Sequence, residues 1–237
     1  MKTGTLFLIP VPLGQMAARA VLPEDVCQRA ASLKHFIAEN AKSARAFLKT
    51  LPSQTPLQEI GITELNEHTR AADLAGLLEP LLSGFDAGLI SEAGCPAVAD
   101  PGAALVALAQ ARGIRIAPMI GPSSILLALM GSGLSGQNFA FHGYLPAKDD
   151  LRQKKIAALE KESRAEKRTQ IFIETPYRNR QMFDALIKTC APQTQICLAT
   201  DLTLEGESIV TRSVANWKKV GSPEIDRRPT VFLLQAA

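Results

Sequence analysis

A loop of small residues with a single acid follows a short apolar run near the middle of the chain. The run 87–90 predicts the end of a buried strand, and Ser91-Glu92-Ala93-Gly94-Cys95-Pro96 follows it directly. Asp100-Pro101-Gly102 then predicts a helix start, because Asp100 can accept bonds from free N–H groups and Pro101 suits the first helical position. Open α/β sheets bind their ligands where a strand ends in such a loop before a capped helix. The pattern predicts a ligand-binding loop, with an ordinary strand-to-helix turn as the alternative.

The four cysteines do not have the spacing of a metal site or a disulfide framework. Cys27, Cys95, Cys190 and Cys197 are scattered and form no Cys-x-x-Cys pair, so we expect reduced thiols, no bound metal and a cytoplasmic location. Cys95 lies in the loop described above and could act as a nucleophile, but a small packed side chain is the favoured interpretation. No apolar run approaches about 18 residues and the start of the chain has no signal-peptide pattern, which predicts a protein without a membrane partner.

The charged residues permit an anionic partner without requiring one. The chain has 26 basic and 23 acidic residues and a net charge of only +3, whereas nucleic-acid binders often carry a larger excess. The segment from Lys148 to Arg168 concentrates eight basic residues against five acidic ones. Such a run is either a solvated helical face or a surface that contacts phosphate groups, and the sequence leaves both interpretations open.

The elements that position these residues alternate regularly in the first half of the chain. Short apolar runs predict strands over 5–9, 34–38, 87–90 and 114–118, separated by loops and amphipathic helices. Pro80 is expected to divide a helix, and the polar segment 63–68 is expected to lie at a strand-to-helix edge. The second half has fewer helices and more strand pairing. The pattern predicts an α/β fold with two domains: residues 1–118 form a mostly parallel sheet with flanking helices, and residues 119–237 form a mixed sheet.

Several segments, in order along nearly the whole chain, carry a resemblance to a known family. They are Gly4–Gly14, Ile90–Pro96 with Ala99–Gly102, Ile120–Ser124, Phe139–Pro146 and Phe172–Arg178. In this order they resemble motifs of the tetrapyrrole methylase family. The first resembles its opening strand and Pro-x-Gly loop, and the second its Ser-Asp-Ala-Gly-x-Pro and Ser-Asp-Pro-Gly signature. The last three resemble its Pro-Gly-Pro-Ser segment, its Gly-Phe-Leu-Pro element and its Tyr-Glu-x-Pro-x-Arg element. This family forms class III of the S-adenosylmethionine-dependent methyltransferases. Within it, the chain is most similar to the subgroup that methylates the ribose 2′-hydroxyl of a cytidine in 16S rRNA.

The resemblance implies that S-adenosylmethionine binds in the cleft between two α/β domains, and that the chain forms a homodimer. Backbone groups of small residues would hold most of the cofactor, because they allow close approach. The implied cofactor residues are Pro12, Leu13, Gly14, Glu92, Ala93, Gly94, Cys95, Ser123, Ser124, Ile173 and Ala199. Glu92 stands where the family usually has Asp, so its side chain either reaches the methionine amine or points elsewhere.

The acceptor side departs from the ribose methyltransferase pattern. Glu39-Asn40-Ala41-Lys42 replaces Glu-Asp-Thr-Arg, Thr63-Glu64-Leu65-Asn66-Glu67 replaces His-Glu-His-Asn-Glu, and Thr200-Asp201-Leu202-Thr203-Leu204 replaces Arg-Glu-Leu-Thr-Lys. The sequence also ends at Ala237 without the small C-terminal extension of that subgroup. The segments that resemble the family's cofactor loops therefore predict a methyltransferase. The changes on the acceptor side remove side chains that could orient an acceptor or contact a phosphate, so the acceptor is less well predicted.

The candidate catalytic residues follow from the chemistry that the resemblance implies. Methyl transfer from a sulfonium is an in-line displacement that depends mainly on alignment, and a ribose hydroxyl also benefits from a base or a positive charge. The candidates are Glu39, Lys42, Glu67, Glu174 and Arg178, with Glu64 and Glu92 as further acids. Glu39 and Glu67 could instead favour helix starts, and Glu174 could form an ion pair with Arg178 one helical turn away.

Three functions stay open at this level. The order of the motifs and the basic segment favour a methyltransferase that acts on RNA, at a ribose 2′-hydroxyl of the 16S rRNA type. The small net charge and the altered acceptor-side residues favour a small acceptor such as a tetrapyrrole. A non-catalytic paralogue would bind the cofactor, or nothing, and act through contacts with other proteins.

Overall fold

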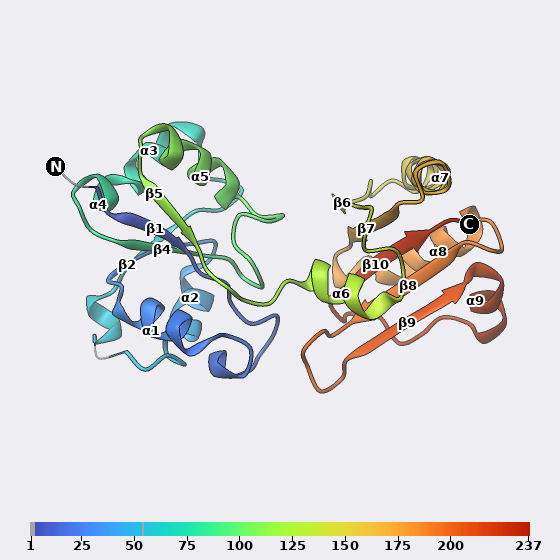
Figure 1. The fold of residues 1–237 in the computed structure, drawn as a ribbon, viewed down its shortest axis with the longest axis horizontal. Helices are drawn as coiled ribbons and strands as arrows, with labels where there is room; N and C mark the ends of the chain where they lie inside the picture. The colour runs from blue at the N-terminus through green and yellow to red at the C-terminus, as the bar shows by residue number, and fades with distance from the viewer. Residues whose placement is uncertain (1–2, 54) are drawn as a thin grey trace. The chain divides into compact units, whose positions relative to one another are not determined.

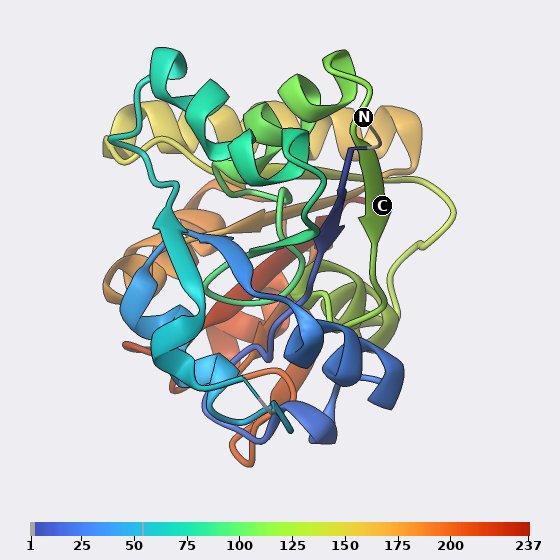
Figure 2. The same ribbon diagram turned by 90° about the vertical axis from the view of Figure 1, so that its left-hand side faces the viewer.

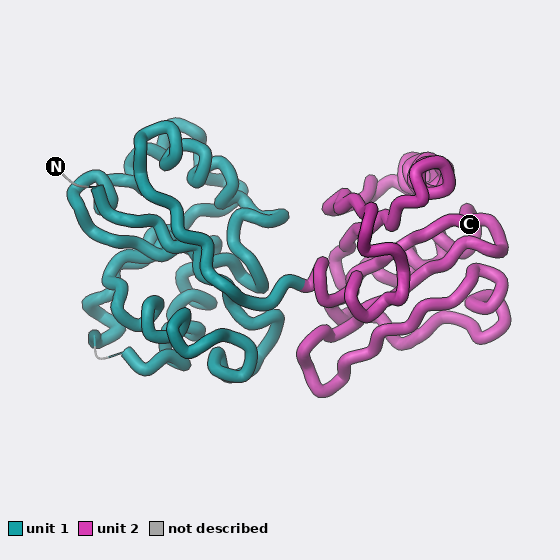
Figure 3. The backbone as a smooth tube through the Cα atoms, in the orientation of Figure 1, with its two compact units in different colours: residues 1–123 teal, residues 124–237 magenta. Residues whose placement is uncertain are grey.

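Two five-stranded sheets organise the chain in the computed structural model, which describes residues 3–53 and 55–237. Each sheet belongs to its own unit, with unit 1 spanning Met1–Ser123 and unit 2 spanning Ser124–Ala237 (Figure 3). The division falls shortly after the end of the last strand of unit 1.

The sheet of unit 1 is entirely parallel, with the strand order β3-β2-β4-β1-β5. Its strands are β1 (Thr5–Leu8), β2 (His35–Ala38), β3 (Gly61–Glu64), β4 (Ala87–Ile90) and β5 (Arg115–Pro118). The central strands read as continuous apolar runs because helices cover both faces of a parallel sheet. The predicted mostly parallel sheet is confirmed. Residues 63–68 lie at a strand-to-helix edge as predicted: Thr63 and Glu64 end β3, an exposed edge strand that tolerates polar side chains, and a loop follows.

Helices cover the two faces of this sheet and build a separate core on each (Figure 1). On one face lie α1 (Glu24–Ser32) and α2 (Ala41–Leu48), and on the other lie α3 (Leu74–Leu77), α4 (Glu79–Leu82) and α5 (Gly102–Ala111). Short 3-10 turns occur at Ala18–Ala20, Leu57–Glu59 and Ala71–Asp73. Alternate residues of β1 enter opposite cores, Leu6 on the α5 side and Ile9, just past the strand, on the α1 side. Figure 2 shows the strands of unit 1 between these two helical layers.

Two sequence signals for helices of unit 1, at Pro80 and at Asp100, are found in the structure. Pro80 lies in the first turn of α4, and the segment is divided there into α3 and α4 as expected. The Oδ1 atom of Asp100 accepts hydrogen bonds from the N–H groups of Gly102 (2.7 Å) and Ala97 (2.9 Å). The carboxylate therefore closes the β4–α5 loop and satisfies an N–H group at the start of α5.

Unit 2 contains the predicted mixed sheet, with the strand order β6-β7-β10-β8-β9. Its strands are β6 (Phe139–Tyr144), β7 (Thr169–Ile173), β8 (Gln195–Thr200), β9 (Ser208–Ser213) and β10 (Thr230–Gln235). The pair β6–β7 is parallel, and the other three pairs are antiparallel. The α/β fold class predicted from the sequence is therefore confirmed in both units.

Four helices accompany the sheet of unit 2. They are α6 (Ser124–Ser132), α7 (Asp149–Glu166), α8 (Asn179–Thr189) and α9 (Val214–Val220), with a 3-10 turn at Pro176–Arg178 before α8. The main core joins α7, α8 and α9 to the sheet through Ile156, Leu186, Trp217 and Phe232, while α6 contacts β8, β9 and β10. The basic segment of the sequence forms the 18-residue helix α7. Within the described residues, no helix is both long enough and apolar enough to cross a bilayer.

Candidate functional site

The loops that follow β1 and β4 meet at the carboxyl edge of the sheet of unit 1. Parallel strands end at the same edge, and a short bridge holds the two loops together: the N–H of Val11 donates to the carbonyl of Gly94 (3.0 Å) and the reverse bond is 3.1 Å long. Gly94 has a φ of +72°, and a Cβ at this position would lie 3.2 Å from Cδ2 of Leu13. A glycine is needed here because both the backbone conformation and the close approach of the loops disfavour a side chain.

This edge offers unused hydrogen-bond donors to a ligand. Among residues 3–53 and 55–237, no acceptor is found for the backbone N–H groups of Leu13, Gly14 and Ala93. Backbone donors that the protein itself does not use must bind water or a ligand. The cofactor that the sequence implies would need such groups at these loops, so the residues present fit it.

The start of α2 extends the same edge and is held by three hydrogen bonds to its N–H groups. Asn40 caps the helix, because its Oδ1 accepts bonds from the N–H groups of Lys42 (2.8 Å) and Ser43 (3.2 Å). The Oε1 of Glu64, at the end of β3, accepts a bond from the N–H of Ala41 (2.9 Å). These bonds fix the direction in which the first turn of α2 presents its side chains.

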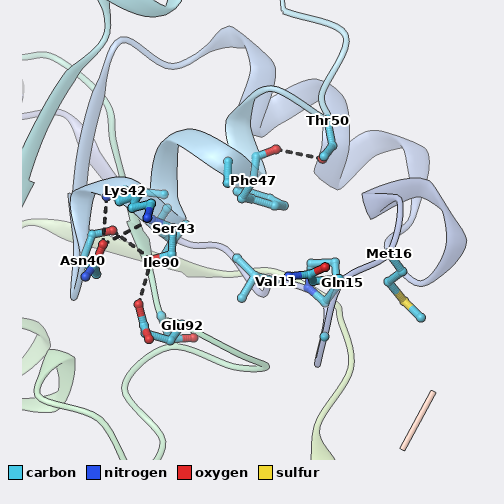
Figure 4. Close-up of a pocket in the computed structure, with 15 residues that line it drawn as sticks. Val11, Gln15, Met16, Asn40, Lys42, Ser43, Phe47, Thr50, Ile90 and Glu92 are labelled. Atoms are coloured by element: carbon cyan, nitrogen blue, oxygen red, sulfur yellow. Dashed lines mark hydrogen bonds between the residues drawn. The ribbon is translucent and has the colours of Figure 1, made fainter. Parts of the chain in front are cut away.

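Glu92 of the β4 loop is joined to this first turn. The hydroxyl of Ser43 donates to Oε1 of Glu92 at 2.7 Å (Figure 4). The longer side chain, found where the family pattern has Asp, is thus directed toward α2. Whether Glu92 also contacts the cofactor stays a prediction.

A cavity of about 640 Å³ lies between the β1 loop, α2 and the β4 loop. Its lining includes the predicted cofactor residues Pro12, Gly14 and Glu92 and the predicted catalytic residue Lys42. Phe47 of α2 and Thr50, two residues past the end of this helix, form another part of the lining (Figure 4). The structure therefore brings donor-side loop residues and one acceptor-side candidate to a single space within unit 1.

Glu39 lies at the end of β2, close to several other acids of this edge. Burial raises the pKa of the half-buried Glu39 carboxyl, and the negative charges of Glu92, Asp100 and Glu67 raise this pKa further. Burial also raises the pKa of Asp100, against the opposing effect of its two backbone hydrogen bonds. A carboxylate with a raised pKa is a better proton acceptor near neutral pH. Glu67 itself is exposed and lies 3.7 Å from Nε2 of His68.

The other two catalytic candidates lie in unit 2 and bind each other. Oε1 of Glu174 accepts bonds from Nε (2.9 Å) and Nη2 (2.6 Å) of Arg178 and from the N–H of Thr175 (2.7 Å). The carboxylate is fully buried, whereas about a third of the Arg178 side chain is exposed. The alternative interpretation of these residues as a local ion pair is confirmed, and a part in catalysis stays a prediction.

The remaining predicted cofactor residues are placed as follows. Ser123 ends unit 1 and Ser124 begins α6 of unit 2. Ile173 of β7 and Ala199 of β8 both pair with Val231 of β10, so they lie at the same level of the unit 2 sheet.

Cys95 is packed within the loops of unit 1. Its thiol lies 3.4 Å from the carbonyl of Pro122. Burial raises the pKa of the Cys95 thiol, which keeps it protonated and argues against a nucleophile. The interpretation of Cys95 as a small packed side chain agrees with this environment.

Several residues of the cavity were not predicted as site residues from the sequence, among them Asn40, Ser43 and Phe47. They line it together with Thr50, and the spacing 40, 43, 47 and 50 places all four on one side of a helix. Phe47 is also in contact with the core. The helical spacing could have identified this face, but only the fold shows that it borders the loops after β1 and β4.

The two sheets define a two-unit α/β fold, and solved structures of methyltransferases have the same fold. The solved structure of the methyltransferase CobJ matches with a TM-score of 0.66 and 18% identity, covering 99% of this chain and 95% of that one. Uroporphyrin-III C-methyltransferase from Thermus thermophilus, solved with bound S-adenosylhomocysteine, matches with a TM-score of 0.60 and 13% identity, covering 98% and 97%. At these identities the likeness shows the fold.

Relatives in sequence identify the family. Ribosomal RNA small subunit methyltransferase I of Vibrio cholerae is 30% identical over 208 residues, which is 86% of this chain and 67% of that protein. The enzyme of the same name from Escherichia coli O157:H7 is 31% identical over 210 residues, or 87% and 68%. No family model matches the chain. The chain belongs to the ribosomal RNA small subunit methyltransferase I family, and the predicted class, an S-adenosylmethionine-dependent methyltransferase, is confirmed.

Proposed function

We propose that this methyltransferase transfers the methyl group of S-adenosylmethionine to a ribose 2′-hydroxyl in small-subunit rRNA. The observation that carries the proposal is the cavity at the carboxyl edge of unit 1, where Pro12, Gly14 and Glu92 line the same space as Lys42. Relatives at 30% and 31% identity are named for methylation of small-subunit rRNA. We also propose, from the resemblance, that the chain acts as a homodimer in the cytoplasm.

The loops of unit 1 are suited to hold the donor through their backbone. The unused N–H groups of Leu13, Gly14 and Ala93 can bind its polar groups, and the Val11–Gly94 bridge keeps the two loops at a constant separation. When bound, S-adenosylmethionine supplies an electrophilic methyl group. The protein contributes alignment, because in-line transfer requires the two reacting atoms to be held about 3–3.5 Å apart.

The acceptor-side residues supply charge and a place for a proton. A hydroxyl oxygen that forms a new bond to carbon must lose its proton, and Glu39 is the acid whose raised pKa best suits it to take that proton. The exposed Lys42 at the cavity can contact a phosphate next to the acceptor. Glu67 contributes a negative charge that helps to raise the pKa of Glu39.

The small net charge and the altered acceptor-side residues favour the alternative of a tetrapyrrole acceptor, whereas the names of the relatives in sequence favour RNA. The matches to CobJ and to uroporphyrin-III C-methyltransferase have at most 18% identity, which supports a common fold and says nothing of the acceptor. The residues that would distinguish the two acceptors are the side chains around the cavity. Lys42 can contact a phosphate, and the Glu39 carboxyl with its raised pKa can take the proton of a hydroxyl group.

The test is transfer of labelled methyl groups to small ribosomal subunits from a bacterium that lacks the related enzyme. We expect label in the RNA, recovered after nuclease digestion as a 2′-O-methylated nucleoside. Lys42→Gln should raise KM for the subunits, whereas Lys49→Gln, which removes the same charge from the C-cap position of α2, should not. The proposal would be overturned by label confined to a base, or by no label in RNA at saturating protein.

A further inference from the structure

The whole positive excess of the chain resides in one segment, Lys148–Arg168. This segment contains eight of the 26 basic residues and five of the 23 acidic ones, so the rest of the chain has 18 of each and no net charge. In the structure the segment forms α7 and its two ends. The helix itself has five basic and five acidic residues, and the excess comes from Lys148, Lys167 and Arg168 at its two ends. Such an excess within one short stretch acts on a partner as a local field, even when the net charge of the protein is small.

Nearly all acids of this segment are neutralised or buried by structural contacts. Asp149 pairs with the buried Arg152 (2.7 Å). Arg168, which also binds Asn138, lies between Glu162 and Glu166. The buried Glu160 accepts bonds from the N–H of Ala191 and the hydroxyl of Thr194. Two of the three arginines of the segment, Arg152 and Arg168, are thus paired with acids, and the third, Arg164, donates to the carbonyl of Ala237.

The lysines of α7 have the opposite environment. Lys154, Lys155 and Lys161, together with Lys167 just after the helix, are exposed, and within the described parts of the chain none lies within 4.0 Å of an acid. We call these four residues the lysine face. Lys154 and Lys161 are two turns apart on the same side of the helix, about 10 Å along its axis. Exposed alanines, Ala158 and Ala165, lie on that side too, so no bulky side chain stands between the ammonium groups.

We propose that the lysine face binds the phosphate backbone of the RNA that carries the acceptor ribose, an inference that rests on the proposed function. Unpaired ammonium groups release counterions when they bind phosphates, and this release supplies sequence-independent affinity. A lipid surface fits less well. A helix that lies on a membrane inserts its apolar side, but Ile156 and Leu159 of α7 are fully buried in the core of unit 2. Apart from Leu151, which is exposed near the start of the helix, the exposed side chains of α7 are small or charged, and this face therefore suits a polyanion that is recognised by its charge.

The experiment measures the affinity of the full chain for unmodified small ribosomal subunits at several salt concentrations. The test variant is Lys154→Gln/Lys155→Gln/Lys161→Gln. The matched control is Lys188→Gln/Lys218→Gln/Lys219→Gln, which removes three exposed lysines from α8 and α9. Each lost phosphate contact lowers the slope of log K against log salt by about 0.7 to 0.9. The test variant should therefore lose about two to three units of slope.

The expected result is a large loss of affinity in the test variant at low salt only. A slope change of about two means that the ratio of its Kd to that of the parent chain shrinks about 16-fold between 50 and 200 mM salt. Its KM for subunits should rise while kcat stays unchanged, because contacts remote from the reacting atoms contribute equally to ground and transition states. The control variant should keep the parent slope.

The outcomes separate this inference from the proposed function. If the parent chain methylates subunits and the test variant keeps the parent slope, the lysine face is overturned while the proposed function stands. If the parent chain neither binds nor methylates subunits, both are overturned. Phosphatidylglycerol vesicles serve as the other polyanion: a lysine-dependent loss of vesicle binding without a change in subunit binding would assign the face to a lipid surface instead.

Discussion

The cap of α2 provides a direct test of whether the cavity of unit 1 is the acceptor site. Asn40 is the residue to change, because its side chain accepts bonds from two N–H groups of the first turn, at 2.8 and 3.2 Å. The same turn presents Lys42 to the cavity and Ser43 to Glu92. Asn40→Ala removes both bonds and leaves the rest of the helix intact. Asn40→Asp keeps an acceptor in the same place.

The expected loss of stability follows from the bonds removed. Replacing an Asn N-cap by Ala costs about 1 kcal/mol, and for a protein of this size that corresponds to a fall in Tm of about 2–4 °C. The rate of methyl transfer should fall much further, by about 10-fold or more, because a misplacement of about 1 Å in a positioning element can cost about 100-fold. Asn40→Asp should keep the parent Tm, since Asp and Asn are equally good caps.

Ser213→Ala is the matched control for this experiment. Ser213 caps α9 in unit 2, where its hydroxyl accepts a bond from the N–H of Asn216 at 3.2 Å, so its loss should cost a similar amount of stability without slowing transfer. Thermal unfolding followed by circular dichroism gives the Tm, and initial rates on small ribosomal subunits give the activity. Equal rates for Asn40→Ala and Ser213→Ala at equal loss of Tm would refute the assignment of the cavity.

Two further predictions concern the acid cluster and the loop bridge. Glu39 holds its proton more tightly in the folded than in the unfolded chain, because burial and then neighbouring charges raise its pKa, so its contribution to the free energy of unfolding falls as pH rises through the raised pKa. In denaturant titrations, the free energy of unfolding of Glu39→Gln minus that of the parent should therefore be larger at pH 8 than at pH 4. The same substitution should lower kcat about 100-fold or more. An unchanged kcat would exclude Glu39 as the base. Gly94→Ala and Gly113→Ala each place an alanine at a φ near +70°, at a cost of about 1–2 kcal/mol. Only Gly94→Ala brings a Cβ to 3.2 Å from Leu13, so it alone should weaken S-adenosylmethionine binding in calorimetry, and equal affinities for the two variants would contradict the assignment of this loop.

The fold could be predicted from the sequence because its signals are local. The run 87–90 is apolar throughout, and it forms β4, which is buried on both faces. Pro80 divides α3 from α4 because its ring removes the backbone N–H and clashes with the preceding turn of a helix. Asp100 closes its loop with bonds to residues two and three positions away. Each of these features depends on residues within one turn or one strand.

The site was less predictable because its geometry depends on which loops meet. Ser43 is 49 residues from Glu92, and no local pattern indicates that they are bonded. Glu64 was a candidate acid, but its Oε1 accepts a bond from the N–H of Ala41, which the parallel pairing of β2 with β3 makes possible. Phe47 packs against the core and also lines the cavity. Long-range contacts of this kind follow from the strand order, which the spacing of apolar runs does not determine.

The departures from the ribose methyltransferase pattern at residues 39–42 affect the structure of the first turn of α2 and the binding of phosphate differently. Asn40 in place of Asp keeps the cap, and the N–H of Ala41 is bonded by Glu64, so the backbone of the first turn of α2 is held without the residues of the pattern. Lys42 in place of Arg keeps a positive charge at the cavity but loses the planar fork that binds phosphate through two hydrogen bonds. The directed, two-bond contact with a phosphate is therefore lost at this position, while the positive charge is kept. A substrate held in this way depends more on undirected charge contacts, which are the kind that the lysine face of α7 offers, and its binding should be correspondingly more sensitive to salt.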